Sequence, residues 1–242
     1  MVEYREFAPS PALRPYVECY WTVHAAHNCP AYPVLPDGCA DLLFSNGPEL
    51  QLVGSMTAAQ NFALAAGSEQ FGIRFRPAMA ALFLRAPWEE LTDRIVTAER
   101  TKLIANQLHQ PLGRIAAVER WLHKLRDPGP VQSIVNWIES GGDLMRMDDL
   151  SRQAGLSTRQ LRRLFLAETG LTPKHLCRVL RFRRAVQRMS SPARPDFAAL
   201  AQDTGFYDQA HFINEFRQFS GGHTPAAWQA QRGRFFQSNL IE

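Results

Sequence analysis

The stretch DDLSRQAGLSTRQLRRLF, residues 148–165, decides the fold of the C-terminal half of this chain. Its first part places Leu150 and Ala154 one helical turn apart, and Gly155 then interrupts the helix before a second amphipathic segment. A short helix, a glycine turn and a second helix are typical of a helix-turn-helix unit. Ser157 with Gln160 three residues later forms a capping-box pattern, so the second helix is predicted to begin at Thr158, while the acidic Asp148 is the N-cap candidate of the first.

The same plan occurs again in DFAALAQDTGFYDQAHFINEF, residues 196–216. Asp196 is a second acidic N-cap candidate, and Gly205 occupies the turn between two apolar-periodic segments. Two further helices are predicted to begin at Thr172-Pro173 and Thr224-Pro225, where a capping hydroxyl precedes a proline in the first helical position. The C-terminal half is therefore predicted to be all helical, with two helix-turn-helix units.

The second helix of each unit combines a buried stripe with exposed polar groups. Phe212, Phe216 and Phe219 stand at i, i+4 and i+7 and predict one buried face, and Leu161, Leu164 and Phe165 do the same in the first unit. Amide and guanidinium groups off these stripes can pair with base edges in the major groove, whereas the alternative role is simple solvation. The candidate DNA-binding residues are Ser157, Thr158, Arg159, Arg162, Arg163, Gln209, His211, Asn214 and Arg217.

Charge is concentrated in the same half. Residues 1–130 hold 12 Lys and Arg against 13 Asp and Glu, residues 131–242 hold 15 against 10, and residues 146–194 hold 12 against 3. A local excess of this kind is expected of a surface that faces nucleic acid. Residues 173–190 predict a helix of about 27 Å, close to the ~34 Å of one DNA turn, which could hold both units against successive major-groove segments. Some of its arginines, at 178, 181, 183, 184 and 188, are expected to contact phosphate and others to be solvated.

The C-terminal half resembles the AraC/XylS family of bacterial transcription regulators. The motifs that carry the resemblance are residues 149–165, 170–173 and 205–216, and it covers roughly 131–232. It implies a regulator of transcription, expected to be an activator, with double-stranded DNA and RNA polymerase as partners. The family's first recognition helix maps onto 158–168, with base-facing positions at Arg159, Arg162 and Arg163. Its second maps onto 208–219, with base-facing positions at Gln209, Ala210, His211 and Asn214.

Two departures from the family pattern concern the last helix. The turn at residues 220–225 is one residue longer than usual, and Trp228 stands where a tyrosine is common. The position of the last helix is therefore left open, but neither change touches a base-facing position.

The N-terminal half alternates β-prone runs with turn signals. Strands are predicted at 16–23, 40–45, 51–54 and 69–75, and helices at 78–84, 88–92, 98–109 and 112–125. The fold class is α+β, with a small β-rich sensor at 1–95, a helical linker at 96–130 and a DNA-binding domain at 131–234. Residues 16–21, 35–44 and 71–77 resemble, more loosely, the sensor of a subset of these regulators, which implies an effector-binding domain without naming an effector.

Candidate ligand-binding residues lie beside the predicted strands. Asp37, Asp41, Arg74 and Arg76 could line a pocket for a polar small molecule, with Trp21 and Tyr32 capping it. The alternatives are ion pairs that join strands and aromatics that belong to the core.

Histidines and cysteines of the same half could be arranged as metal ligands. His24, His27 and Cys29, with Cys19 and Cys39 near them, match no zinc spacing, so neither a metal nor a cofactor is expected.

The remaining patterns limit the class of protein. No nucleophile with a base, convergent carboxylate pair or phosphate loop is evident, so an enzyme is not expected. No window reaches the ~18 apolar residues of a membrane span, and we expect a cytoplasmic protein with reduced cysteines. The apolar stripe at 112–125 could pair two protomers in a homodimer or pack on its own domain. The competing hypotheses are a helical protein-interaction module and a regulator without a small-molecule effector.

Overall fold

The computed structural model describes residues 2–45, 50–97, 113–122, 129–140, 147–190 and 195–230. The strands are β1 (Val2–Phe7), β2 (Val17–Ala25), β3 (Cys29–Val34), β4 (Ala40–Phe44), β5 (Leu50–Val53), β6 (Gln60–Leu64), β7 (Ser68–Phe75) and β8 (Ile95–Thr97). The helices are α1 (Ala80–Phe83), α2 (Trp88–Leu91), α4 (Arg114–Leu122), α5 (Pro130–Glu139), α6 (Met147–Ala154), α7 (Thr158–Thr169), α8 (Pro173–Met189), α9 (Phe197–Asp203), α10 (Gln209–Phe219) and α11 (Pro225–Ala230). The predicted α+β class, with a β-rich N-terminal part and a helical C-terminal part, is confirmed.

The strands form two antiparallel sheets. Six strands pair in the order β1-β2-β7-β4-β5-β8, and β3 pairs with β6 in a separate two-stranded sheet. The four predicted strands correspond to β2, β4, β5 and β7, whereas β1, β3, β6 and β8 were not predicted.

Successive side chains of a strand point to opposite sides of the sheet, and both faces of the large sheet hold buried residues. On one face Tyr20, Leu42 and Ile73 pack with residues of α1, α2 and α4 in a common core. On the other face Trp21 and Leu43 pack with residues of the β3–β6 pair. The second face holds the cavity described below.

Helix α4 packs on its own domain. Val118 and Leu122 are fully buried in the core of the large sheet, with Ile115 partly buried beside them. Of the two alternatives for this stripe, the structure shows packing within the chain. The ends of the predicted stripe at 112 and 125, and the predicted helix 98–109, lie outside the described residues.

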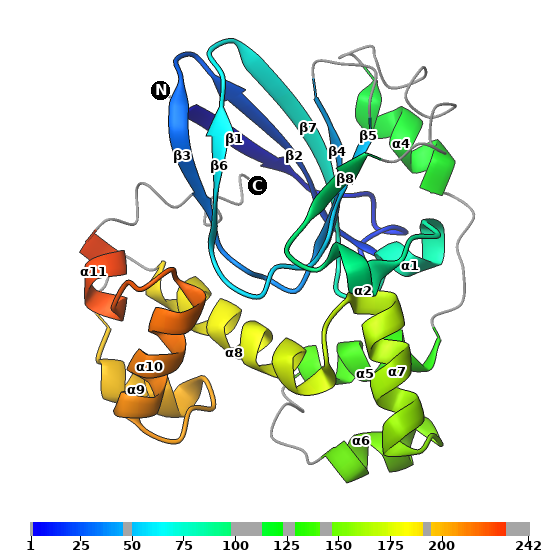
Figure 1. Cartoon of the computed structure of the whole chain (residues 1–242), viewed down its shortest axis with the longest axis vertical. Coiled ribbons are helices and arrows are strands. Elements are labelled where there is room, and N and C mark those ends of the chain that lie inside the picture. The colour runs from blue at the N-terminus through cyan, green and yellow to red at the C-terminus, as the bar shows by residue number, and fades with distance from the viewer. Residues whose placement is uncertain are drawn as a thin grey trace.

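The helical part places the two helix-turn-helix units, α6–α7 and α9–α10, at opposite ends of α8, with the sheet domain above them (Figure 1). The first unit shares a core with α5 and the start of α8, and the second shares one with the end of α8. In that second core Trp228 of α11 is buried and meets Phe216 edge to face at a centroid distance of 6.0 Å.

The helix starts predicted from capping residues in the C-terminal half are confirmed with one exception. Ser157 and Gln160 form the capping box of α7, Thr172 caps α8, and the Ala227 N–H donates to Thr224 Oγ1 at 3.1 Å at the start of α11. Asp196 caps α9 as predicted. The prediction for Asp148 was wrong: α6 already begins at Met147, so this carboxylate lies in the first helical turn, where it still complements the helix dipole.

Candidate nucleic-acid interface and the cavity of the sheet domain

The first half of α7 presents its arginines to solvent. Leu161 and Phe165 are fully buried, whereas Arg159, Arg162 and Arg163 are exposed and make no ion pair with any described residue. Exposed guanidinium groups without carboxylate partners are suited to phosphate oxygens and to the acceptors of guanine.

The two hydroxyl candidates at the start of α7 are already engaged within the chain. Ser157 Oγ donates to Gln160 Oε1 at 2.7 Å and accepts from the Gln160 N–H at 3.3 Å. Thr158 Oγ1 accepts from Ser151 Oγ at 3.2 Å. Both side chains stabilise the N-terminus of α7. Their contact with DNA stays a prediction.

Helix α10 is built similarly on a buried aromatic stripe. Asp208 caps its N-terminus, and Gln209, Asn214 and Arg217 are exposed. His211 is half-buried: its Nδ1 accepts from the Tyr207 N–H at 3.3 Å. The Nδ1 atom of His211, a residue predicted to contact bases, therefore stabilises the turn before α10.

Three arginines of α8 contact other side chains of the molecule. Arg178 donates to both oxygens of Glu215 at 2.7 and 2.8 Å, and Arg188 donates to Asp203 at 2.7 Å, so both tie α8 to the second unit. Arg181 stacks over the Phe206 ring at 5.5 Å. The predicted phosphate contacts of α8 are thus less available than those of α7.

The sheet domain contacts the C-terminal ends of both candidate recognition helices. Thr92 Oγ1 donates to the carbonyl oxygen of Gly170, directly after α7, at 2.7 Å. The Ala59 N–H donates to the carbonyl oxygen of Phe219, at the end of α10, at 2.9 Å. The base-facing candidates cluster toward the opposite, N-terminal ends of these helices, so the sheet domain does not cover them.

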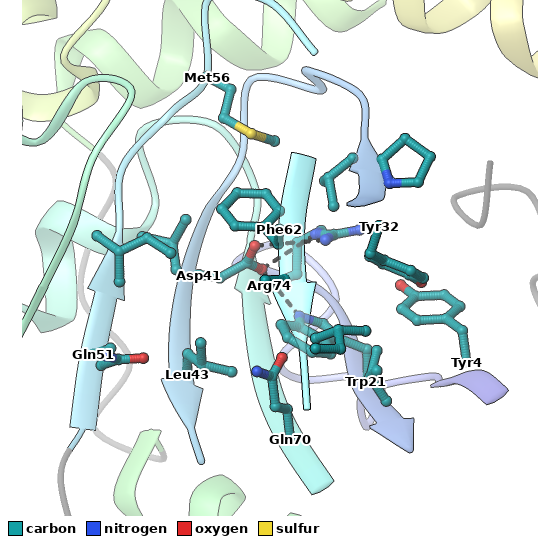
Figure 2. A pocket seen from close by; sticks show the side chains of 17 residues that line it. Tyr4, Trp21, Tyr32, Asp41, Leu43, Gln51, Met56, Phe62, Gln70 and Arg74 are labelled. Carbon is teal, nitrogen blue, oxygen red and sulfur yellow. Dashed lines mark hydrogen bonds and ion pairs between the residues drawn. The ribbon is translucent and has the colours of Figure 1, made fainter. Parts of the chain in front are cut away.

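A cavity of about 200 Å³ lies between the second face of the large sheet and the β3–β6 pair. Figure 2 shows aromatic, amide and charged side chains around it. Of the predicted ligand residues, Trp21, Tyr32, Asp41 and Arg74 line this cavity.

The two remaining ligand candidates lie elsewhere. Asp37 lines a smaller cavity of about 70 Å³ toward the helical part, together with Arg183 of α8. Arg76 lines neither cavity. It joins the two parts of the molecule by an ion pair with Glu139 of α5, and it also pairs with Glu18 of β2 in its own domain.

The charged centre of the larger cavity is Arg74, buried among carboxylates. Its Nε lies 3.2 Å from Asp41 and 3.4 Å from Asp37, and its Nη1 lies 3.8 Å from Glu6. Burial raises the pKa of Asp41, although Arg74 opposes that shift. Because Asp41 and Arg74 face each other on β4 and β7, the alternative role as a strand-joining ion pair is also present.

Sequence reasoning missed several residues that line the cavity. Gln51 and Gln70 share the faces of their strands with Asp41 and Arg74, so period-two alternation could have found them. Tyr4 and Phe62 lie on β1 and β6, which carried no recognised strand signal.

The described parts of the chain hold neither a metal-binding group of side chains nor a membrane-spanning helix. No three His, Cys, Asp or Glu side chains there are grouped so that they could hold a metal ion, and the cysteines are thiols. No helix in these parts has the length and apolar character needed to cross a bilayer.

Comparison with known proteins assigns both halves to families. Residues 5–97 match the family described as "Domain of unknown function (DUF6597)", and residues 150–231 match the family described as "Helix-turn-helix domain". No curated protein matches the chain.

Three of the solved structures to which the chain is similar are the following. An AraC-type transcriptional regulator from Chromobacterium violaceum is 28% identical over 43% of this chain and 91% of its own, with a TM-score of 0.39. The DNA-binding domain of AdpA, solved in complex with a target DNA, is 26% identical over 46% of this chain and 100% of its own, with a TM-score of 0.40. ToxT from Vibrio cholerae is 9% identical over 95% of this chain and 97% of its own, with a TM-score of 0.46.

The capped units at the two ends of α8, together with the family match over residues 150–231, define a helix-turn-helix DNA-binding protein. The C-terminal part is a helix-turn-helix domain of the AraC type, and it follows a domain of unknown function in the N-terminal part.

Proposed function

We propose that this regulator binds specific sequences of double-stranded DNA by placing α7 and α10 in the major groove. The observation that carries the proposal is the contrast between two sets of arginines. Those of α7 are exposed and without ion pairs among the described residues, whereas Arg178, Arg183 and Arg188 of α8 are held by carboxylates. Unpaired cations at the start of a capped helix are available for phosphates and bases.

Within this proposal the two helices read bases differently. Arg159, Arg162 and Arg163 make α7 the cationic reader, suited to guanine and phosphate. Gln209 and Asn214 make α10 a reader through amides, which pair with adenine, and Arg217 lies one turn further along. His211 contributes through the nitrogen that does not accept from Tyr207.

The test is selection of bound fragments from random duplex DNA by the full chain, followed by affinity measurements at several salt concentrations. We expect one enriched sequence and an affinity that falls steeply as salt rises, because phosphate contacts release counterions. An affinity independent of salt, or no enriched sequence, would instead support the competing function, a helical module that binds another protein.

We further propose that the sheet domain senses a small molecule in the cavity beside Arg74 and transmits its presence to the DNA-binding helices. The loop between β5 and β6 supports this route. Met56 of that loop lines the cavity, and Ala59, three residues on, holds the end of α10. A regulator that needs no effector is the alternative.

The effector proposal is tested by comparing DNA affinity with and without each compound that raises the melting temperature of the full chain. A stabilising compound that shifts DNA affinity supports it, and stabilisers that never do so contradict it.

The direction of regulation follows from the family resemblance. We propose activation, with RNA polymerase as the protein partner, in the bacterial cytoplasm where the DNA lies. Transcription with purified components tests this: the regulator should raise transcript yield from a promoter that carries the selected sequence, and a lowered yield would indicate repression. Homodimer formation, the last proposed association, is measured by the mass of the chain in solution at working concentrations.

A further inference from the structure

The larger cavity has an aromatic wall whose orientation is fixed by the sheet. The Trp21 indole lies directly over Gly72 of β7, since a Cβ built at that glycine would overlap the indole ring. Tyr4 stacks near the same indole at a centroid distance of 6.3 Å. Figure 2 shows Tyr32 beside Tyr4 and Phe62 nearer Asp41, so aromatic rings border the space from several strands.

A carboxylate is fixed to the edge of this wall. Asp41 Oδ1 accepts from Trp21 Nε1 at 3.2 Å and from Arg74 Nε at 3.2 Å, and both bonds are drawn in Figure 2. The negative charge therefore lies beside the indole. A cation near an indole face is attracted by the electrons of the ring, and an adjacent carboxylate adds to that attraction.

The charge balance around Arg74 disfavours an anionic ligand. Its one guanidinium already has three carboxylates within 3.8 Å, those of Asp41, Asp37 and Glu6. A ligand carboxylate would be a fourth negative group, whereas a ligand cation would offset an existing excess. Burial raises the pKa of Asp41, and a ligand cation beside it would oppose that shift, as Arg74 does.

Size and the remaining lining restrict the ligand further. A volume of about 200 Å³ is below the roughly 300–1,000 Å³ of pockets for drug-sized molecules, so the ligand is small. Leu43, Val53 and Met56 offer apolar contact, and Gln51 and Gln70 offer amides.

We infer that this cavity binds a small organic ammonium ion that carries an apolar group, with the cation beside Asp41 and Trp21. This inference rests on the proposed sensing role of the sheet domain and names the chemical class of its ligand. The apolar group lies against Leu43 and Met56, and the amides select for orientation.

The test uses three probes with one ring and different charges: 2-phenylethylammonium, 2-phenylethanol and phenylacetate. Titration calorimetry of the full chain at neutral pH should give binding at least about tenfold tighter for the ammonium ion than for the alcohol, and the weakest binding for the carboxylate. A tenfold ratio corresponds to a modest contribution from the cation–π contact and the carboxylate together. Equal or tighter binding of phenylacetate would overturn the inference, as would the absence of binding by all three.

Substitutions that change the charge at Gln70 test the inference without a substitution of Asp41 itself. Gln70→Glu should tighten and Gln70→Lys should weaken binding of the ammonium probe by at least about threefold, as expected for a charge near a partly buried site. Gln202→Lys, which adds the same charge on exposed α9, is the matched control and should leave binding unchanged. Identical affinities for both Gln70 variants would contradict the inference.

Failure of this inference is distinguishable from failure of the proposed DNA-binding function. Salt-dependent binding to the selected duplex is measured on the same preparation. If DNA binding persists while the ammonium preference is absent, only the ligand class is wrong.

Discussion

The Ala59 N–H donates a hydrogen bond of 2.9 Å to the carbonyl oxygen of Phe219, the last residue of α10. The last carbonyl groups of a helix have no partner within it, and here the sheet domain supplies one. Because Met56 of the same loop lines the cavity, three residues of chain and this hydrogen bond connect the cavity to the second helix-turn-helix unit.

Replacing Ala59 by proline removes this donor. We expect Ala59→Pro to lower the free energy of unfolding by about 1 kcal/mol, the usual net value of one hydrogen bond. Hydrogen exchange should become faster in the β5–β6 loop and at the end of α10 but stay unchanged in α7. Ala59→Ser, which keeps the N–H, is the control. Unchanged exchange at the end of α10 would show that the contact does not couple the two parts.

Two arginines of the helical part should respond differently to removal. Arg162→Ala should leave the melting temperature unchanged and weaken DNA binding by about 1–3 kcal/mol at one base position, if the contact is bidentate. Arg178→Ala should lower the free energy of unfolding by about 1–2 kcal/mol, because it removes paired hydrogen bonds to Glu215. Chemical denaturation and duplex titration of both variants check this. Equal stability losses would remove the distinction between the α7 and α8 arginines.

We expect the glycine directly after α7 to tolerate substitution poorly because the sheet domain lies close to it. Gly170 has a φ of 73°, and a Cβ there would lie 2.5 Å from the Trp88 carbonyl oxygen. Gly170→Ala should cost at least about 2 kcal/mol in the free energy of unfolding, from the left-handed backbone and from this overlap.

A matched control for that substitution lies in the turn of the first unit. Gly155 has a φ of 64° but nothing within 4 Å of its Cβ position, so Gly155→Ala should cost only the backbone term of about 1 kcal/mol. Equal losses in denaturant unfolding for the two variants would mean that Trp88 does not pack closely on α7.

Acid should weaken the structure near His175 at the start of α8. Burial lowers the pKa of His175, Arg178 lowers it further, and the Thr57 backbone, Asp93 and Glu215 oppose the shift. The unfolded chain therefore takes up the proton first, so the stability contribution is complete above about pH 6.5 and is lost as pH falls below it.

Melting temperatures between pH 7.5 and 5.5 test this sign. His175→Gln should flatten the decline relative to the unmodified chain, and His24→Gln, at an exposed position of β2, should not. A decline of the same steepness in His175→Gln would assign the acid sensitivity to other groups.

The helix-turn-helix units could be predicted because their signals are local. Ser157 with Gln160, and Thr172 with Pro173, specify helix starts within four residues of sequence, and the structure confirms both. The sheet was harder to predict because β3 contains Pro30 and Pro33, which normally disfavour strands, and β8 has three residues.

The residues of the candidate sites likewise include some that the sequence could predict and some that it could not. Strand alternation explains why Trp21, Asp41 and Arg74 share one face of the sheet, and the pairing of β7 with both β2 and β4 brings them to one cavity. No local signal could show that Arg76 and Arg183 serve the contact between the two parts, since Glu139 and Glu18 are distant in sequence and become neighbours only through tertiary packing.

The central claim is that α7 and α10 read separate segments of one DNA duplex, and base-by-base interference mapping tests it most directly. On the selected duplex, Arg162→Ala should abolish interference at one segment and Asn214→Ala at another, about one helical turn away on the same face. Loss at the same bases in both variants, or uniform weakening at every base, would contradict the account.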